Sequence, residues 1–355
     1  LEILMSTGNW PPKPWVEGLS KSKLVDQVHV WPTEADLSQV EVLLVWKPLP
    51  QGVVDRLPNL KFISSIGAGV DHLLGDTQIP LDIPVARIVD ERLTGDMTNY
   101  VMMAVVMHQR GILKVLENQK QAKWERHHYP QLKVGVLGLG QLGGYLALTL
   151  KTAGFEVSGY SRSPKELDGI ETYSGEELPD FLSTLNVLVN LLPVTPQTER
   201  ILNKSLFNQV KRGAYLINVA RGAHLVEEDL ISALDEEQLS GAMLDVFHEE
   251  PLSSDHPFWS HSKITITPHI ASVTTPSSAM KLVLCVGIAW IAADFFGLDN
   301  VATGILVLQV ATPVAVTSYM LAEKYGADAE SVAGLVVVST VMSIGALPLL
   351  LALLL

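Results

Sequence analysis

Short apolar runs separated by turns organise the chain up to residue 98. Four of these runs have the length of a β-strand, at residues 2–5, 42–46, 61–66 and 85–88. The segments between them carry helix-like spacing of apolar positions, as at residues 17–25 and 53–57, and this alternation is typical of α/β structure. The pattern predicts a small α/β domain over residues 1–98, followed by a long helix over residues 97–121 that crosses to a second domain.

A more regular alternation runs from residue 99 to residue 279. Residues 132–137 form a continuous apolar run, which suits a strand at the buried centre of a parallel sheet. An apolar helix is expected next at residues 142–150, and further strands at residues 155–160, 187–191, 214–219, 241–245 and 264–266. Strands that alternate with helices in this way predict a doubly wound parallel sheet, the Rossmann type of α/β fold.

The segment from residue 281 to residue 355 has a different composition. It holds two basic and five acidic residues, with apolar stretches at 282–298, 301–321 and 332–355. The last two stretches are uncharged and long enough to cross a bilayer core of about 30 Å as helices. This predicts an all-helical hydrophobic tail of membrane type, which would associate the chain with a membrane. A buried helical hairpin in a soluble core is the alternative.

The composition of the whole chain excludes several classes of function. A chain of 355 residues that is 48% hydrophobic can bury a core in each of two domains. Its net charge of −13 disfavours nucleic-acid binding, because no basic run offsets the repulsion of a phosphate backbone. The lone cysteine, Cys285, cannot form an internal disulfide, and neither zinc-ligand spacing nor a signal peptide is found. We therefore expect no metal, no nucleic-acid partner and a cytoplasmic catalytic part.

A glycine-rich segment directly follows the predicted central strand and opens the next helix. Residues 138–143 read GLGQLG, which fits the pattern G-x-G-x-x-G in the context that dinucleotide binding requires. In such a turn the glycines let the backbone approach a pyrophosphate, and the helix N-terminus faces the phosphates with its free amides. The predicted cofactor-binding residues are Gly138, Gly140, Gln141, Leu142 and Gly143. A glycine turn without a ligand is the alternative.

The end of the second predicted strand of this sheet favours NADPH over NADH. An NAD-binding fold places an Asp or Glu about 20 residues after the glycine turn, whereas Ser161, Arg162 and Ser163 stand here. No carboxylate repels a 2′-phosphate at this place, and a guanidinium can bind it, so these three residues are candidates for holding NADP. NADH is the weaker alternative as cofactor. Arg162 could also be an ordinary exposed loop residue that binds no cofactor.

Three polar residues, Arg221, Glu250 and His269, lie at or just beyond the ends of later predicted strands. Ligands of open α/β sheets bind outside the carboxyl ends of the strands, so these side chains could converge on one crevice. A histidine beside a carboxylate is the usual acid and base pair near neutral pH, because the carboxylate favours the protonated imidazole. Spacing alone leaves each residue open between a catalytic and a structural role.

With these motifs, residues 1–279 resemble the D-isomer-specific 2-hydroxyacid dehydrogenase family, and within it the glyoxylate/hydroxypyruvate reductase A branch. The resemblance rests on the glycine turn and on the segments at residues 67–71, 190–196, 219–222, 245–252 and 267–269. It implies a flavodoxin-like substrate domain beside the dinucleotide-binding domain. It further implies NADPH-dependent reduction of a short 2-keto acid, such as glyoxylate or hydroxypyruvate, by an enzyme that forms a homodimer.

The resemblance also assigns chemical roles. His269 would protonate the carbonyl oxygen of the substrate, Glu250 would keep His269 protonated and oriented, and Arg221 would bind the substrate carboxylate and keto oxygen. In the first domain, the backbone amides of Ala68 and Gly69 would hold the carboxylate.

Other residues are implied around the cofactor and the substrate. Leu192, Pro193 and Thr198 would line the ribose, and Asp245 would accept a hydrogen bond from the nicotinamide carboxamide. Trp46 stands where this branch places a tryptophan near the substrate, although an ordinary aromatic at a strand end explains it nearly as well.

The tail has a resemblance of its own, at residues 311–316 and 319–326, to the C-terminal helices of auxin efflux carrier family transporters. It has too few spans for a transporter alone. In the dehydrogenase family the chain instead continues into a helix that returns to the first domain, so we interpret the join near residue 280 as a fusion or an assembly join, ahead of a natural membrane-tethered enzyme. Two other functions stay open: a non-enzymatic NADPH-binding sensor tethered to a membrane partner, and a transporter fragment fused to a dehydrogenase.

Overall fold

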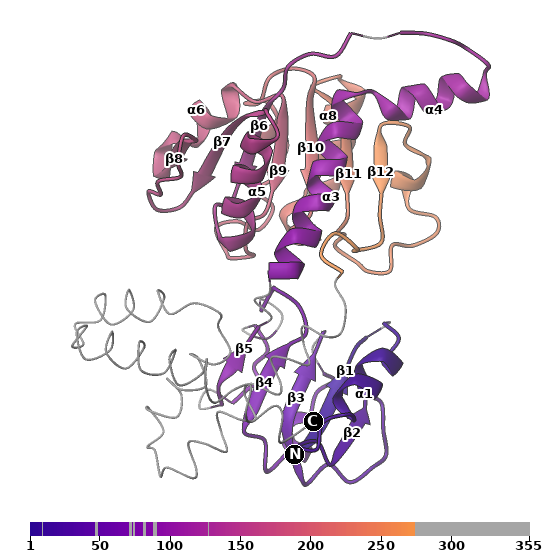
Figure 1. Ribbon diagram of the computed structural model, residues 1–355, viewed down its shortest axis with the longest axis vertical. Helices are drawn as coiled ribbons and strands as arrows, with labels where there is room; N and C mark the ends of the chain where they lie inside the picture. The colour runs from indigo at the N-terminus through magenta and orange to yellow at the C-terminus, as the bar shows by residue number, and fades with distance from the viewer. Residues whose placement is uncertain are drawn as a thin grey trace. The chain divides into compact units, whose positions relative to one another are not determined.

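The computed structural model describes residues 1–8, 10–46, 49–70, 73, 75–80, 83–87, 91–126 and 128–273. These residues form two compact units, the first ending at Asp90 and the second running from Glu91 to Thr274 (Figure 1). The predicted tail at residues 281–355 lies outside the described residues. In the part of the chain that is described, none of the helices combines the length and the apolar character that a bilayer crossing requires.

A five-stranded parallel sheet forms the centre of the first unit. Its strands are β1 (Glu2–Ser6), β2 (Gln27–Val30), β3 (Val40–Val45), β4 (Phe62–Ser65) and β5 (Val85–Ala86). They stand in the order β2-β1-β3-β4-β5, and each neighbouring pair is parallel. Leu4, Leu43 and Ile63 in the central strands are fully buried. This is the strand order of flavodoxin-like folds, which confirms the fold predicted for this unit.

Local structure in the first unit departs from the sequence pattern in three places. The helix expected at residues 17–25 is instead α1 (Lys13–Leu19), which begins earlier with a proline in its first turn, where a missing backbone N–H costs nothing. Residues 53–57 form only the short 3₁₀ turn η1 (Val54–Arg56). Strand β2 was not expected, because it is short and pairs with β1 alone at the edge of the sheet.

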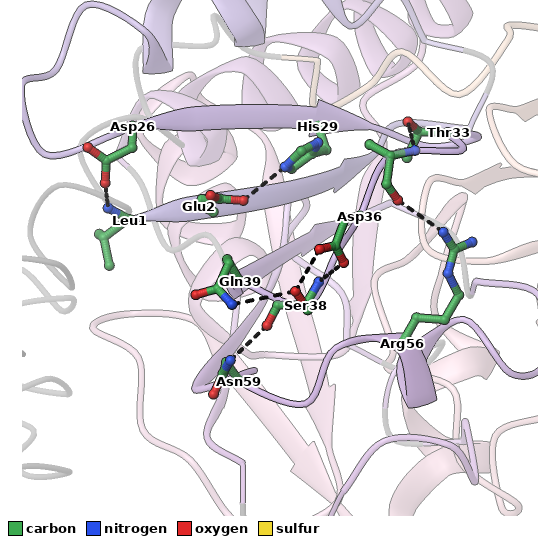
Figure 2. Close-up of polar contacts among 11 residues, drawn as sticks. Leu1, Glu2, Asp26, His29, Thr33, Asp36, Ser38, Gln39, Arg56 and Asn59 are labelled. Atoms are coloured by element: carbon green, nitrogen blue, oxygen red, sulfur yellow. Dashed lines mark hydrogen bonds and ion pairs between the residues drawn. The ribbon is translucent and has the colours of Figure 1, made fainter.

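Polar contacts hold the amino edge of the first sheet (Figure 2). The amino group of Leu1 bonds the Asp26 carboxylate at 2.7 Å, and Glu2 pairs with His29 across β1 and β2 at 3.1 Å. Asn59 donates to the backbone oxygen of Ser38 at 2.7 Å, between the segments that lead into β3 and β4. These contacts lie near the amino ends of the strands. They therefore leave the loops at the carboxyl ends of the strands available to the candidate site.

A seven-stranded parallel sheet forms the second unit. Its strands are β6 (Lys133–Leu137), β7 (Glu156–Ser161), β8 (Glu171–Ser174), β9 (Val187–Asn190), β10 (Ala214–Asn218), β11 (Leu239–Leu244) and β12 (Ile264–Ile266). Their order is β12-β11-β10-β9-β6-β7-β8, so the direction of winding reverses between β6 and β9. This confirms the predicted doubly wound Rossmann sheet, whose ligand crevice lies at the carboxyl ends of the strands beside that reversal.

Helices cover both faces of the second sheet (Figure 1). The helices α3 (Glu91–Gln109) and α5 (Gln141–Thr152) pack on one face, and α6 (Leu178–Ser183), α7 (Lys204–Phe207) and α8 (Glu227–Asp235) pack on the other. Neighbouring strand residues alternate between the two cores: Val136 belongs to the α3 side and Leu137 to the α6 side. Burial on both faces is why the strands read as continuous apolar runs.

The prediction of one long helix over residues 97–121 was wrong. The segment forms α3, which ends at Gln109, and a separate helix α4 (Ile112–Lys120). Gly111 lies between them with φ of +58°, a left-handed conformation that a continuing α-helix cannot contain and that glycine adopts at little cost. The glycine therefore marks a break that the apolar spacing did not reveal.

Candidate active site

The glycine turn joins β6 to α5 at the reversal point of the second sheet. Gly138 has φ of +109°, and a Cβ added to it would lie 2.7 Å from the backbone oxygen of Leu191. A Cβ at Gly143 would lie 1.9 Å from the backbone oxygen of Gly138, so the helix can approach the strand only without side chains here. Around Gly140, by contrast, a Cβ would meet nothing within 4 Å. The turn thus leaves backbone exposed on the side where a dinucleotide binds.

The first turn of α5 supplies the donors for a phosphate group. Gln141 and Leu142 are its first two residues, and the backbone amides of a first helical turn have no partner earlier in the helix. Together with the partial positive charge of the helix N-terminus, they favour an anion. This geometry fits the pyrophosphate of a nicotinamide dinucleotide.

Two cationic side chains follow the end of β7. Arg162 and Ser163 are exposed, while Ser161 is buried and donates from its hydroxyl to the backbone oxygen of Ser163 at 2.7 Å. Lys165 donates to the backbone oxygen of Leu139 at 2.5 Å, which ties this loop to the glycine turn. Lys165 was not among the predicted cofactor residues. The two cations suit the additional phosphate that distinguishes NADP from NAD.

The loop after β9 lies across the reversal from the glycine turn. Thr198 donates to the backbone oxygen of Pro193 at 2.6 Å and closes the loop on itself. The amide of Leu192 donates to the side chain of Asn190 at 3.2 Å, at the end of the strand. The predicted ribose-lining residues Leu192, Pro193 and Thr198 therefore lie in one ordered loop beside the predicted cofactor site.

A buried histidine that the motifs did not identify supports this loop. His224 is fully buried; its Nδ1 lies 3.0 Å from the side-chain nitrogen of Asn190, and its Nε2 lies 3.2 Å from the backbone oxygen of Pro193. An amide nitrogen only donates and a carbonyl only accepts, so Nδ1 accepts and Nε2 carries the hydrogen. Asn190 also donates to Asn218 at 3.0 Å. The neutral imidazole thus links the ends of β9 and β10 to the cofactor loop.

The histidine and glutamate predicted to act together are in direct contact. Nδ1 of His269 lies 2.8 Å from Oε2 of Glu250, and the two side chains are 20% and 23% exposed. The second carboxylate oxygen of Glu250 accepts from the backbone amide of Phe247 at 3.1 Å. The glutamate is therefore anchored at one oxygen while the other orients the imidazole, the arrangement of an acid or base pair.

Arg221 belongs to the same edge of the sheet, directly after β10. Its guanidinium donates to the backbone oxygen of Ala220 at 2.7 Å, and its own backbone oxygen accepts from Asn218 at 3.1 Å. A Cβ at the next residue, Gly222, would lie 1.9 Å from the backbone carbon of Phe247. The Arg221 loop therefore packs against the loop whose amide anchors Glu250, and the structure brings the three predicted residues into one continuous assembly.

Asp245 organises the segment that carries His269. It is 1% exposed, and its Oδ1 accepts from the hydroxyl of Thr267 at 2.6 Å and from the amide of Ile270 at 2.8 Å. Its Oδ2 accepts from the amide of Ala271 at 2.8 Å. Burial raises the pKa of Asp245 above its ordinary value, against the opposing effect of these hydrogen bonds and of His269. The family resemblance implies that Asp245 bonds the nicotinamide carboxamide, which stays a prediction; in the structure its carboxylate holds the segment on both sides of His269.

These bonds hold a strained backbone. His269 has φ of +55°, a left-handed conformation that costs a non-glycine residue about 1 to 3 kcal/mol. Its amide donates to the backbone oxygen of Asp245 at 2.8 Å, and the carboxylate of Asp245 fixes the two residues that follow. Strain of this kind persists where the surroundings over-determine it, as at a site that requires one side-chain direction.

The first unit carries its predicted substrate residues on loops at the carboxyl ends of its strands. Trp46 follows β3, and its ring lies 5.0 Å from that of Trp10, which follows β1. A Cβ at Gly67 would lie 2.4 Å from Cζ3 of Trp46, so the loop that continues into Ala68 and Gly69 packs closely on the indole. Trp10 was not predicted, because no motif includes it.

A second unpredicted residue restrains the same loop. The guanidinium of Arg87 donates to the backbone oxygen of Ala68 at 2.9 Å, and burial lowers the pKa of Arg87. Arg87 follows β5 at the sheet edge, where no sequence pattern marked it. The contact fixes the carbonyl of a residue whose amide was predicted to bind substrate.

Comparisons with known proteins agree with this geometry. Residues 102–271 match the family described as D-isomer specific 2-hydroxyacid dehydrogenase, NAD binding domain. Over 281 residues the chain is 41% identical to glyoxylate/hydroxypyruvate reductase A of Yersinia enterocolitica, which covers 77% of this chain and 89% of that protein.

Solved structures show the same likeness. The NADPH-dependent glyoxylate/hydroxypyruvate reductase of Sinorhizobium meliloti, in complex with NADP and sulfate, has a TM-score of 0.76 and 33% identity, covering 85% of this chain and 99% of that one. A D-isomer specific 2-hydroxyacid dehydrogenase of Xanthobacter autotrophicus, in complex with NADPH and MES, has a TM-score of 0.75 and 35% identity, covering 84% and 96%.

Proposed function

Because the chain belongs to the D-isomer-specific 2-hydroxyacid dehydrogenase family, we propose that it reduces a short 2-keto acid, of the glyoxylate and hydroxypyruvate type, to the 2-hydroxy acid with NADPH. The observation that carries the proposal is the contact of 2.8 Å between His269 and Glu250, on the sheet edge that also bears Arg221 and the glycine turn. A non-enzymatic NADPH sensor would have no need for this pair.

The reaction consumes one hydride and one proton per keto group. Bound NADPH supplies the hydride, and the residues of the chain supply the proton and hold the substrate. Because Glu250 accepts from Nδ1 of His269, the proton for the keto oxygen comes from Nε2, and the imidazole is left neutral until solvent returns a proton. Arg221 carries the fixed positive charge that a substrate carboxylate requires, and it can bind two oxygens at once.

In this proposal the predicted substrate residues of the first unit act through the loops that follow β3 and β4. The backbone amides of Ala68 and Gly69 bind the substrate carboxylate, and Arg87 steadies their loop through the backbone oxygen of Ala68. Trp46, held against Trp10, provides an apolar wall that excludes water. Charges that act in a dry site interact more strongly than in water, so a wall of this kind strengthens the bonds from these amides to the carboxylate.

The proposal is tested by following the loss of NADPH absorbance with the purified chain. Glyoxylate and hydroxypyruvate are expected to be reduced, whereas acetaldehyde, which has a carbonyl but no carboxylate, is expected to react poorly because Arg221 has no partner on it. NADPH binding without turnover on any 2-keto acid would refute the enzymatic reading and support the sensor.

Arg162 is expected to set the preference for NADPH. Replacement of Arg162 by alanine removes charge-assisted hydrogen bonds to the 2′-phosphate, so the KM for NADPH should rise about 10- to 100-fold while the KM for NADH stays nearly unchanged. Steady-state kinetics with both cofactors measure the effect, with the exposed Arg126→Gln as a matched control. An equal rise in the KM for NADH and for NADPH would show that Arg162 does not bind the 2′-phosphate.

We also propose that the second unit forms a homodimer through the segment of residues 112–126 and 128–131, which includes α4 (Ile112–Lys120) and is called the arm below. Leu113, Leu116 and Trp124 are exposed on this arm, Trp124 to 93%, and a group of large apolar side chains of this kind marks an interaction surface. Light scattering should give the mass of two chains for the wild type and of one chain for Leu116→Glu. A monomeric wild type would contradict this assembly.

Membrane association of residues 281–355 stays a prediction from their uncharged apolar stretches. Membrane fractionation of cells that express the whole chain tests it, because a tail of membrane type keeps the chain in the pellet until detergent is added.

A further inference from the structure

Tyr100 lies on α3 and outside every motif discussed above. Its ring packs against the core on the α3 side of the second sheet. Its hydroxyl lies 2.5 Å from Oγ1 of Thr267, a contact between residues 167 positions apart. Thr267 stands two residues before His269. The contact therefore joins the first helix of the second unit to the segment that carries the proposed proton donor.

The direction of this hydrogen bond follows from its neighbours. The hydroxyl of Thr267 has one hydrogen, which it gives to Oδ1 of Asp245 at 2.6 Å, because an ionised carboxylate can only accept. Tyr100 must then be the donor to Thr267. Burial raises the pKa of Tyr100 well above its ordinary value, so the phenol keeps its hydrogen at every pH at which an enzyme works. A line of donors thus runs from Tyr100 through Thr267 to Asp245.

Asp245 passes this constraint to the backbone around His269. The Oδ1 atom that accepts from Thr267 also accepts from the amide of Ile270, and Oδ2 accepts from the amide of Ala271. A carboxylate held by three donors cannot rotate without breaking at least one of these bonds. Loss of the Tyr100 hydroxyl leaves Thr267 free to turn and so loosens the carboxylate that holds the left-handed turn at His269.

We infer that Tyr100 is a positioning residue for the reductase reaction, acting on His269 through Thr267 and Asp245. The inference rests on the proposed function, because it assigns His269 the proton transfer. Tyr100 itself touches no reacting atom in this account; it sets the direction from which the imidazole presents Nε2. Small errors in the placement of a reacting group slow catalysis more than they weaken binding.

The Tyr100→Phe variant tests the inference, because it removes only the hydroxyl. We expect kcat for glyoxylate to fall about tenfold while the KM for NADPH stays within about twofold of wild type, since the glycine turn and Arg162, which are predicted to hold the phosphates, are untouched. Tyr145→Phe is the matched control, because Tyr145 is 52% exposed on α5. It should keep wild-type kcat. Thr267→Val interrupts the same line of donors at its middle and is expected to lower kcat in the same way. It tests the inference if Tyr100→Phe does not fold.

Hydrogen exchange in the cofactor-free protein separates this inference from the proposed function. The amides of Ile270 and Ala271 should exchange about tenfold faster in Tyr100→Phe than in wild type, and at the wild-type rate in Tyr145→Phe. If the wild type reduces no 2-keto acid, the proposed function fails while the exchange rates still decide the positioning claim. Unchanged exchange of these two amides, or an unchanged kcat in an active enzyme, overturns it.

Discussion

Replacement of His269 by alanine is expected to lower kcat for glyoxylate reduction by about 10³-fold, with the affinity for NADPH within about twofold of wild type. The reason is that the reduced keto oxygen carries a full negative charge unless a proton arrives with the hydride. Nδ1 of His269 is engaged by Glu250 at 2.8 Å, which directs the proton on Nε2 to the substrate. Water is a much weaker acid than imidazolium and cannot replace it efficiently.

Two further variants make the His269 result specific. Glu250→Gln keeps the size of the side chain and removes the charge that orients the imidazole, so kcat should fall by a smaller factor, about 10- to 100-fold. His128→Ala replaces an exposed histidine of the arm and should leave kcat unchanged. Stopped-flow measurement of a single turnover isolates the chemical step from product release. A single-turnover rate in His269→Ala equal to that of wild type would remove His269 from the mechanism.

The strands that sequence predicted best are those buried on both faces. β6, β9 and β10 read as continuous apolar runs because α3 and α5 cover one face and α6 to α8 the other. The edge strand β8 (Glu171–Ser174) escaped prediction because all four of its residues are partly or fully accessible, which leaves no apolar run to detect. β2 (QVHV) escaped because its one buried residue is the polar His29, which adds no apolar position to detect.

The sequence could predict which residues lie at the edge of the sheet where the candidate site forms, but it could not predict the hydrogen bonds among them. Arg221, Glu250 and His269 each follow a strand, and parallel strands bring their carboxyl ends to one edge, so their convergence follows from topology. The supporting bonds, such as Asn190 with His224 and Tyr100 with Thr267, join residues far apart in the chain. They depend on side-chain directions that no periodicity encodes, and on the left-handed turn at His269, which local preference disfavours.

Replacement of Arg221 by glutamine is expected to lower kcat/KM for glyoxylate by about 10³-fold, mainly through a higher KM. A 2-keto acid brings a carboxylate into a site that already contains Glu250 and the buried Asp245. Without a guanidinium the substrate charge meets two carboxylates of its own sign, so both binding and orientation suffer. Arg221→Lys keeps the charge but loses the planar pair of donors, and it should recover only part of the activity.

The carboxylate of the substrate provides the decisive comparison for Arg221. If the guanidinium acts by binding it, Arg221→Gln should reduce turnover of glyoxylate far more than the slow turnover of acetaldehyde, because only glyoxylate loses an ion pair. If Arg221 instead acts only by packing its loop against Phe247 through Gly222, both substrates should lose activity in proportion, and the melting temperature should fall. Arg212→Gln controls for the loss of a positive charge. Arg212 lies at the amino ends of the strands, away from the candidate site, where it bonds the backbone oxygen of Glu236. A proportional loss on both substrates would therefore assign Arg221 a structural role.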